Sequence, residues 1–218
     1  MADSRIITGV VPGRVTADAQ WVGARGTRDG AQYVASWLEA LALEGRMFHA
    51  NMGTVTTPIT FLVTAANRPD AWVRVPSGTT ILPVKVNVAL EAFAGTATEL
   101  DIRTAENDIG NGTSTAAAVG PQRAHTAGTI TSNCTARQLA TGDTTAETSP
   151  ISIYRRTIPT ADAAGNDLAG SILVTREEMG YPVLVGPATL ELFIAATTTQ
   201  ATGFVIVTWA EVPSNSLT

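Results

Sequence analysis

Few residues of this chain are of the types that perform nucleophilic catalysis. The sequence contains 2 histidines, His49 and His125, and 1 cysteine, Cys134. A Ser-His-Asp or Cys-His arrangement would need one of these histidines beside a serine or beside the cysteine. His49 falls in a strand-like stretch and His125 in a polar loop, and neither is flanked by the sharp glycine-rich turn that exposes a nucleophile. We therefore expect structural histidines and no catalytic residues of this kind.

Acidic residues offer a second kind of chemistry. Glu91, Glu99 and Asp101 lie on or near strands that could pair, and two carboxylates at a suitable separation can hydrolyse a glycosidic bond. Acidic residues on strands usually face solvent or an arginine instead. The hypothesis of an enzyme rests on these three carboxylates, and we expect that the protein is not an enzyme.

The signals for a metal or a cofactor are incomplete. The segments 106–111 and 162–167 carry carboxylates and amides that could bind Ca²⁺, but neither has the EF-hand spacing. Gly110-Asn-Gly112 resembles the start of a dinucleotide-binding fingerprint, without its third glycine and without a strand–turn–helix around it. A Gly-Lys-Ser/Thr phosphate loop is excluded because Lys85 is the only lysine. We expect solvated loop carboxylates, no metal and no cofactor.

The 4 tryptophans could provide a surface on which sugars stack. Trp37 belongs to a helical stripe, and Trp209 follows two valines at alternating positions, so core packing is expected for both side chains. Trp21 and Trp72 keep a carbohydrate-binding role open.

Charge and composition exclude several classes of partner. The net charge is −5 and the pI is about 5.0, and the basic residues are scattered, with Arg155-Arg156 as the only adjacent pair. This pattern argues against direct binding of nucleic acid, which needs clustered cations. The first residues lack the layout of a signal peptide, and no apolar run approaches the roughly 18 residues of a membrane span. We expect a protein made in a cytoplasm, with no membrane partner.

The low charge content indicates contacts with neighbouring subunits. Only 15% of the residues are charged, against roughly 25% in average soluble domains. A free monomer normally carries more charge on its surface. The deficit predicts a surface that other chains partly cover.

The N-terminal part of the chain predicts an arm followed by one helix. Residues 1–29 are rich in glycine and arginine and contain short apolar pieces, which is typical of an extended arm lying on another surface. Over residues 30–45, Tyr33, Trp37 and Leu41 recur every four residues and a glycine closes the pattern. This spacing predicts a short helix with an aromatic stripe.

Residues 46–213 have the pattern of a β domain. Short apolar stretches are separated by glycine and proline turns, with no β-α-β alternation and no repeat period. The clearest strand covers residues 79–93, where apolar residues alternate from Val84 to Leu90 and Pro83 indicates an edge or a bulge.

We therefore predict an all-β fold, a β-sandwich or jelly roll of about ten strands, with an N-terminal extended arm and one short helix. A long loop is expected over residues 105–128, because glycine, alanine, threonine and asparagine dominate there. Residues 214–218 are expected to form a C-terminal tail.

Three stretches carry a resemblance to a known class of protein. They are Val75-Pro-Ser-Gly-Thr-Thr-Ile-Leu-Pro-Val-Lys-Val-Asn-Val88, Gly186-Pro-Ala-Thr-Leu-Glu-Leu-Phe-Ile, and Gly203-Phe-Val-Ile-Val-Thr-Trp-Ala-Glu-Val-Pro213. In texture, over about residues 45–213, the chain resembles β-sandwich structural proteins of virus particles, in particular capsid and head-decoration proteins of tailed bacteriophages. The basic arm of small RNA-virus coats is absent, as are the long spine helix and greater length of the usual major shell subunit of tailed phages. The resemblance therefore implies an accessory or outer-shell protein of the virion.

The expected function is that of a non-enzymatic virion structural protein, a capsid or head-decoration (cement) subunit that stabilises a shell. It would self-associate as a homo-oligomer, as a trimer or a ring, and bind other capsid subunits. The alternative is a receptor- or carbohydrate-binding β-sandwich module of a phage tail or fibre, with Trp21, Trp72 or Tyr181 facing the sugar. The residues expected to contact other subunits are Ile6, Ile7, Val10, Val11, Trp21, Tyr33 and Trp37.

Overall fold

The computed structural model describes residues 37–54, 56–62, 68–92, 98–122, 131–140, 144–158, 170–196 and 200–213. The predicted arm (1–29), the start of the predicted helix (30–36) and the predicted tail (214–218) lie outside the described residues. The described residues contain one helix and twelve strands, so the prediction of an all-β fold is confirmed. Their bounds are α1 Trp37–Leu43, β1 Met47–Met52, β2 Ile59–Thr60, β3 Ala71–Val75, β4 Thr79–Ala92, β5 Thr98–Ala105, β6 Thr115–Pro121, β7 Thr135–Gln138, β8 Ile151–Ile158, β9 Gly170–Thr175, β10 Leu184–Val185, β11 Ala188–Ala196 and β12 Thr202–Pro213.

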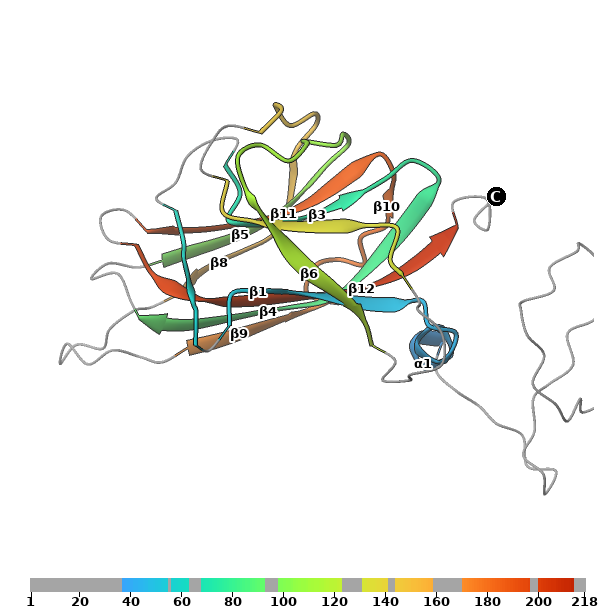
Figure 1. Ribbon diagram of the computed structural model, residues 1–218, viewed down its shortest axis with the longest axis horizontal. Coiled ribbons are helices and arrows are strands. Elements are labelled where there is room, and N and C mark those ends of the chain that lie inside the picture. The colour runs from blue at the N-terminus through green and yellow to red at the C-terminus, as the bar shows by residue number, and fades with distance from the viewer. Residues whose placement is uncertain are drawn as a thin grey trace, which may run out of the picture. The chain divides into compact units, whose positions relative to one another are not determined.

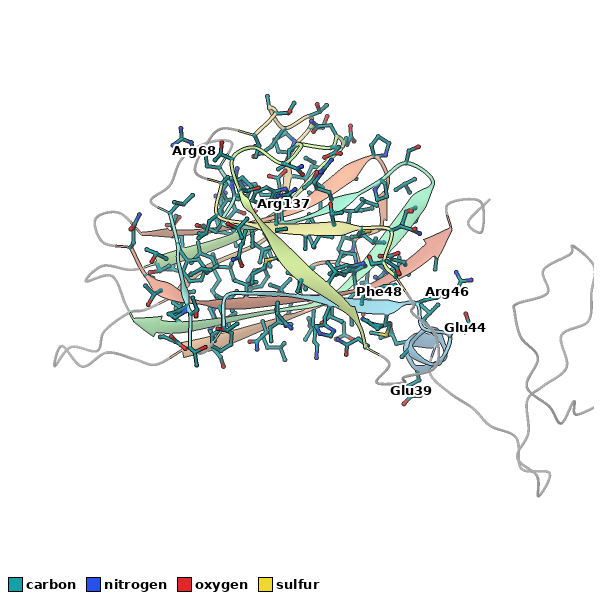
Figure 2. The ribbon with its side chains drawn as sticks, viewed as in Figure 1. Glu39, Glu44, Arg46, Phe48, Arg68 and Arg137 are labelled. Atoms are coloured by element: carbon teal, nitrogen blue, oxygen red, sulfur yellow. The ribbon has the colours of Figure 1, made fainter. Side chains whose placement is uncertain are left out.

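Helix α1 ends where the sequence predicts. Gly45 has a φ of 73°, a left-handed conformation that glycine adopts without strain, and its N–H donates to the carbonyl of Ala42 at 3.0 Å. The N–H of Arg46 donates to the carbonyl of Leu41 at 2.8 Å, which closes the last turn. An ion pair of 3.2 Å between Arg46 and Glu44 follows the helix (Figure 2).

The strands form one curled antiparallel sheet. Their order is β10-β4-β12-β1-β6-β7-β3-β11-β5-β8, with β9 also paired to β4 and β2 also paired to β12. Strand β6 joins the two halves, since its residues 118–121 pair with β1 and its residues 115–117 pair with β7. Figure 1 shows β6 crossing from the strands around β1 to those around β7.

Strand β6 corrects the prediction of a loop over residues 105–128. Its sequence, Thr115-Ala-Ala-Ala-Val-Gly-Pro121, has small side chains that are half-buried or exposed, so no alternation of apolar and polar residues marks it as a strand. Backbone hydrogen bonds to β1 and β7 hold it in place instead. The segment from Glu106 to Ser114 is irregular, as predicted.

One hydrophobic core contains side chains from both halves of the sheet. Val88 on β4 and Val207 on β12 belong to the same buried cluster as Leu190 on β11. Trp209 is fully buried in this cluster, and its ring centroid lies 6.4 Å from that of Phe48. The predicted core role of Trp209 is therefore confirmed. Figure 2 shows the side chains between the two halves, with Phe48 labelled.

A β-bulge in β4 changes which residues face the core. Lys85 on β4 pairs with Thr208 on β12, but the next residue of β12, Trp209, pairs with Pro83. Val84 is therefore the extra residue of the bulge, with no partner of its own on β12. The bulge predicted from Pro83 is confirmed. Val84 is only half-buried, which corrects its predicted place on the core face, because the bulge shifts the alternation by one residue.

Asp70, just before β3, ties three segments together inside the protein. Its carboxylate accepts the N–H of Leu62 at 2.5 Å and the N–H of Ile194 at 2.6 Å. Burial raises the pKa of Asp70 to about 7, although these two hydrogen bonds act in the opposite direction. Asp70 thus has a structural role at the ends of β3 and β11.

Candidate functional site

The outer face of β3 and β11 is the face turned away from the main core, and it is nevertheless buried. The residues that alternate with the core side chains of these strands include Trp72 and Glu191, both fully buried. Trp72 packs with Ile109 and Ala140, which belong to the segments after β5 and β7. The indole N–H of Trp72 donates to the carbonyl of Gly110 at 3.3 Å. The described residues of these two segments, 106–114 together with 139–140 and 144–149, therefore cover the outer face.

Trp72 is not available to a sugar. A stacking platform needs an exposed aromatic face, and the exposed fraction of Trp72 is 0% because the covering segments pack on it. The sequence leaves a carbohydrate-binding role open for Trp21 and Trp72. The structure excludes Trp72 from that role, and Trp21 lies outside the described residues.

Two glutamates meet under the covering segments. Glu191 on β11 is fully buried, and among the described residues neither of its carboxyl oxygens has a hydrogen-bond partner. The negative charge of Glu147, from the covering segment, acts on it, and the Glu147 carboxylate lies 3.8 Å from a guanidinium nitrogen of Arg103. Burial, and then the charge of Glu147, raise the pKa of Glu191 to about 9. Glu191 is thus a neutral acid at pH 7.

Asp101, one of the predicted carboxylates, is the centre of an ion-pair cluster. Its Oδ2 accepts hydrogen bonds from Arg103 at 2.7 Å and Arg155 at 2.8 Å, and Ser152 donates to Oδ1. Burial raises the pKa of Asp101, but the hydrogen bonds from Arg155, Ser152 and Arg103 outweigh it and hold the pKa below its usual range. The Arg103 guanidinium also lies 4.4 Å from the ring centroid of Phe193. A carboxylate held ionised in this way links β5 to β8 and is not a proton donor.

The carboxylate pair on which the enzyme hypothesis rests is not formed by strand pairing. Glu91 is exposed on β4 and Glu99 is exposed on β5, strands that stand near opposite ends of the sheet order. The glutamates that the structure brings together are Glu147 and Glu191, which sequence reasoning missed. One signal was present: Glu191 stands inside the apolar run Leu190-Glu-Leu-Phe-Ile194. With no exposed surface, the Glu191 carboxyl offers a substrate no access.

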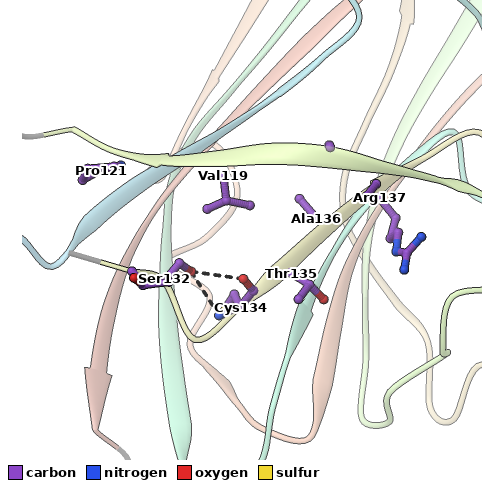
Figure 3. A pocket seen from close by; sticks show the side chains of 10 residues that line it. Val119, Pro121, Ser132, Cys134, Thr135, Ala136 and Arg137 are labelled. Atoms are coloured by element: carbon purple, nitrogen blue, oxygen red, sulfur yellow. Dashed lines mark hydrogen bonds between the residues drawn. The ribbon is translucent and has the colours of Figure 1, made fainter. Parts of the chain in front are cut away.

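A pocket of about 490 Å³ lies between β6 and the segment 131–137 (Figure 3). Small and apolar side chains dominate its lining, with Cys134 on one wall and Arg137 as its charged residue. Burial, and next the charge of Glu211, raise the pKa of the Cys134 thiol far above its usual range. The thiol therefore stays protonated and is a poor nucleophile.

Hydrogen bonds around Cys134 serve to anchor the pocket wall. The Ser132 hydroxyl donates to Glu211 and accepts the N–H of Cys134 at 3.0 Å. Glu211 also accepts the indole N–H of Trp209 at 2.9 Å and the N–H of Asn133 at 3.0 Å. Ser132 is thus bound to a carboxylate rather than to a histidine, and the cluster fastens the segment before β7 to β12.

Neither histidine is placed beside a nucleophile in the described part of the chain. His49 on β1 packs over Gly120 of β6, where an added Cβ would lie 3.5 Å from the imidazole ring. Its Nδ1 is buried and has no hydrogen-bond partner among the described residues. His125 lies outside the described residues.

The side chains around residue 108, which carry the incomplete Ca²⁺ signal of the sequence, are bound by an arginine. Arg74 binds both carboxylate oxygens of Asp108, with Nε at 2.6 Å from Oδ1, and also binds the side chain of Asn111. Hydrogen bonds from Arg74 lower the pKa of Asp108. Within the described ranges no group of three or more His, Cys, Asp and Glu side chains could hold a metal ion. The second predicted segment, 162–167, lies outside those ranges.

The exposed hydrophobic side chains lie on the two free edges of the sheet. In the described residues β8 pairs only with β5, and β9 and β10 pair only with β4. We call residues 151–158 the β8 edge and residues 170–185 the β9–β10 edge. The exposed large hydrophobics of the described chain are Ile151 on the β8 edge and Leu173, Tyr181, Val183 and Val185 on the β9–β10 edge, with exposed fractions of 52–57%.

Of the contact residues predicted from the sequence, only Trp37 is among the described residues. Trp37 is the first residue of α1, and its side chain is not among the described ones. The remaining predicted contact residues, which lie outside the described residues, are Ile6, Ile7, Val10, Val11, Trp21 and Tyr33.

No helix in the described residues is long and apolar enough to cross a membrane.

Comparison of the chain with protein-family models, with curated proteins and with solved structures found no match.

Proposed function

We propose that this protein is a non-enzymatic structural subunit that self-associates and stabilises a shell, as a capsid or head-decoration protein of a virion. The single observation that carries the proposal is the position of the exposed hydrophobic side chains on the two free edges of the sheet. An edge strand presents unpaired backbone N–H and C=O groups, and natural proteins usually protect it with charge, proline or a covering segment. Here both edges expose apolar side chains beside their charged residues, and such a surface is suited to contact another chain.

The energy available from these side chains is of the size that association needs. Each of the five has about half of its surface exposed, so its burial in an interface contributes about 1 kcal/mol. Together they contribute about 5 kcal/mol, which matches only the lower range of the entropic cost of association, about 4–15 kcal/mol. Stable association therefore also requires backbone hydrogen bonds along the edges, or additional contacts such as the predicted arm.

The state of the reactive groups supports a role without catalysis. Glu191 is neutral and buried, Asp101 is held between two arginines, and the Cys134 thiol is protonated. A general acid or a nucleophile must reach its substrate. These groups stabilise the covering segments and strand ends instead.

The packing of the sheet supports the finer description as a β-sandwich related to jelly rolls. Side chains from the half around β12 and the half around β11 share one core, as the two inner faces of a sandwich do. In this description β6 is the strand that passes from one layer to the other.

The first test is the native mass of the purified chain, measured by light scattering on a sizing column at 1–100 µM protein, a range of about two decades. We expect a trimer, a ring or a larger assembly whose mass rises with concentration. A second protein lacking residues 2–28 is expected to lose assembly if the predicted arm contributes. A monomer of the full chain across the whole range, with no binding to shells, would refute the proposal.

The carbohydrate-binding alternative now depends on Tyr181 and on Trp21, which lies outside the described residues. Tyr181 is 57% exposed, and the Arg176 guanidinium lies 5.7 Å from its ring centroid. An exposed aromatic ring beside a cation is a suitable surface for a sugar. A glycan screen at millimolar sugar, with Tyr181→Ala as control, distinguishes the two functions: binding that this variant abolishes would favour the alternative.

A further inference from the structure

The two free edges of the sheet carry opposite charges. The β8 edge contains Arg155 and Arg156, the only adjacent pair of basic residues in the chain, and both are exposed. The β9–β10 edge contains Glu177 and Glu178 in the turn after β9, and both are exposed. Each edge therefore combines exposed apolar side chains with exposed charges of one sign. The remaining charged residue of the β9–β10 edge, Arg176, is half-buried, and its guanidinium donates to the carbonyl of Pro83 at 3.3 Å.

Two of these four charges have roles within the subunit. Arg155 donates to Asp101 at 2.8 Å, across β5 and β8. Glu178 accepts the N–H of Thr175 at 2.7 Å, which stabilises the turn after β9. In the described part of the chain, no ion pair involves Arg156 or Glu177. These two residues are the charges that each edge can offer to another molecule.

We propose that the β8 edge of one copy docks on the β9–β10 edge of a second copy, with Arg156 facing the acidic turn that contains Glu177. This inference rests on the proposed self-association and adds which surfaces meet. Pairing an edge with its own kind would place Arg156 against Arg156, or Glu177 against Glu177, and like charges in an interface are unfavourable. Pairing the two different edges joins opposite charges.

The same pairing satisfies the backbone and the apolar side chains. Ile151 on the β8 edge and Leu173, Val183 and Val185 on the β9–β10 edge are all about half exposed in the single chain, so the contact has apolar side chains on both sides. The edge strands can continue the sheet from one copy to the next through backbone hydrogen bonds. Because the two surfaces differ, repeated contacts build a ring where the rotation closes and an open filament where it does not, and a two-fold dimer forms where both edges pair at once.

Charge reversal tests the pairing. The variants are Arg156→Glu, Glu177→Arg, and the two changes together. Each single change places like charges across the contact, and we expect the dissociation constant to rise by about tenfold or more, as for a close charge pair. The double change swaps the signs and is expected to restore association to within about threefold of the wild type. An equal mixture of the two single variants is also expected to associate, because their altered edges complement each other.

The control and the readouts separate this inference from the proposed function. Glu44→Arg makes the same charge change as Glu177→Arg at an exposed position after α1, on neither edge, and it should leave association unchanged. Light scattering gives the mass, and circular dichroism confirms that each variant is folded. Wild-type assembly that both single variants retain would overturn the edge pairing while leaving self-association standing. A wild-type chain that stays monomeric would overturn both.

Discussion

Replacing Glu191 by glutamine should make the protein more stable at neutral pH. In the folded chain the buried carboxyl keeps its proton up to a pH of about 9, whereas the unfolded chain releases it near the ordinary value of 4.5. Between these values unfolding releases a proton, so a rise in pH favours unfolding and the free energy of unfolding falls. Below pH 4.5 the site has no such effect. The glutamine side chain is of similar size and is neutral at every pH.

The magnitude follows from the width of the pH interval. Each pH unit above 4.5 removes about 1.4 kcal/mol from the free energy of unfolding, so the loss reaches about 3 kcal/mol at pH 7. This is a large fraction of the 5–15 kcal/mol that roughly bounds the stability of most domains. Relative to the wild type, Glu191→Gln is therefore expected to gain about 3 kcal/mol between pH 4.5 and pH 7, and more as the pH approaches 9.

Urea denaturation at several pH values between 4.5 and 9 measures this difference. Asp70, whose pKa is also raised, titrates in both proteins and cancels in the comparison. Glu99→Gln removes an exposed carboxyl from the neighbouring strand, and its stability should stay within about 0.5 kcal/mol of the wild type. A difference between Glu191→Gln and wild type that is constant over the whole pH range would show that Glu191 is not buried as a neutral acid.

Three further predictions concern stability and reactivity. Asp70→Ala leaves two backbone N–H groups inside the protein without an acceptor and should reduce the free energy of unfolding by about 2–5 kcal/mol; a melting temperature within a degree or so of the wild type would contradict this role. Gly203→Ala would place a Cβ 2.0 Å from the carbonyl oxygen of Ala89, so it should prevent close pairing of β12 with β4 and lower the urea midpoint strongly. The control variant Gly120→Ala meets only ordinary contacts and should leave the urea midpoint unchanged. Equal midpoints for the two variants would refute the steric argument. Cys134 should react with a thiol reagent only after the protein is denatured, because the thiol is buried and protonated; rapid labelling of the native protein at pH 8 would disprove this.

Within the main core the sequence predicts the strands well, because the alternation of apolar and polar residues along a strand indicates which side chains are buried. Val86, Val88 and Leu90 on β4 alternate along the strand and are buried as expected. The bulge could be anticipated from Pro83, but the residue displaced from the core depends on how β4 pairs with β12. Strand order was beyond the sequence, since the pairing of antiparallel strands leaves a weak signal in one chain.

The candidate site was less predictable, because segments far apart in the chain form it. Trp72 and Glu191 lie on the outer face of their strands, where a side chain is normally in contact with water. Their burial depends on the described residues 106–114, 139–140 and 144–149, whose composition indicates only irregular structure. Asp101 was identified as a carboxylate of interest. Its partner Arg103 follows two residues later on the same strand, but its second partner, Arg155, depends on the pairing of β5 with β8.

The position of β12 between β4 and β1 has a consequence for synthesis on the ribosome. Met47 on β1 pairs with Ala210 on β12, and Lys85 on β4 pairs with Thr208 on β12. Both β1 and β4 therefore lack one neighbouring strand until β12 is translated, which happens after every other described strand. Until β12 emerges, a nascent chain holds two apolar strands with open backbone edges, the condition in which neighbouring chains on one messenger can pair wrongly. This half of the sheet therefore closes late, and the interval before β12 appears is when the growing chain most needs protection by a chaperone.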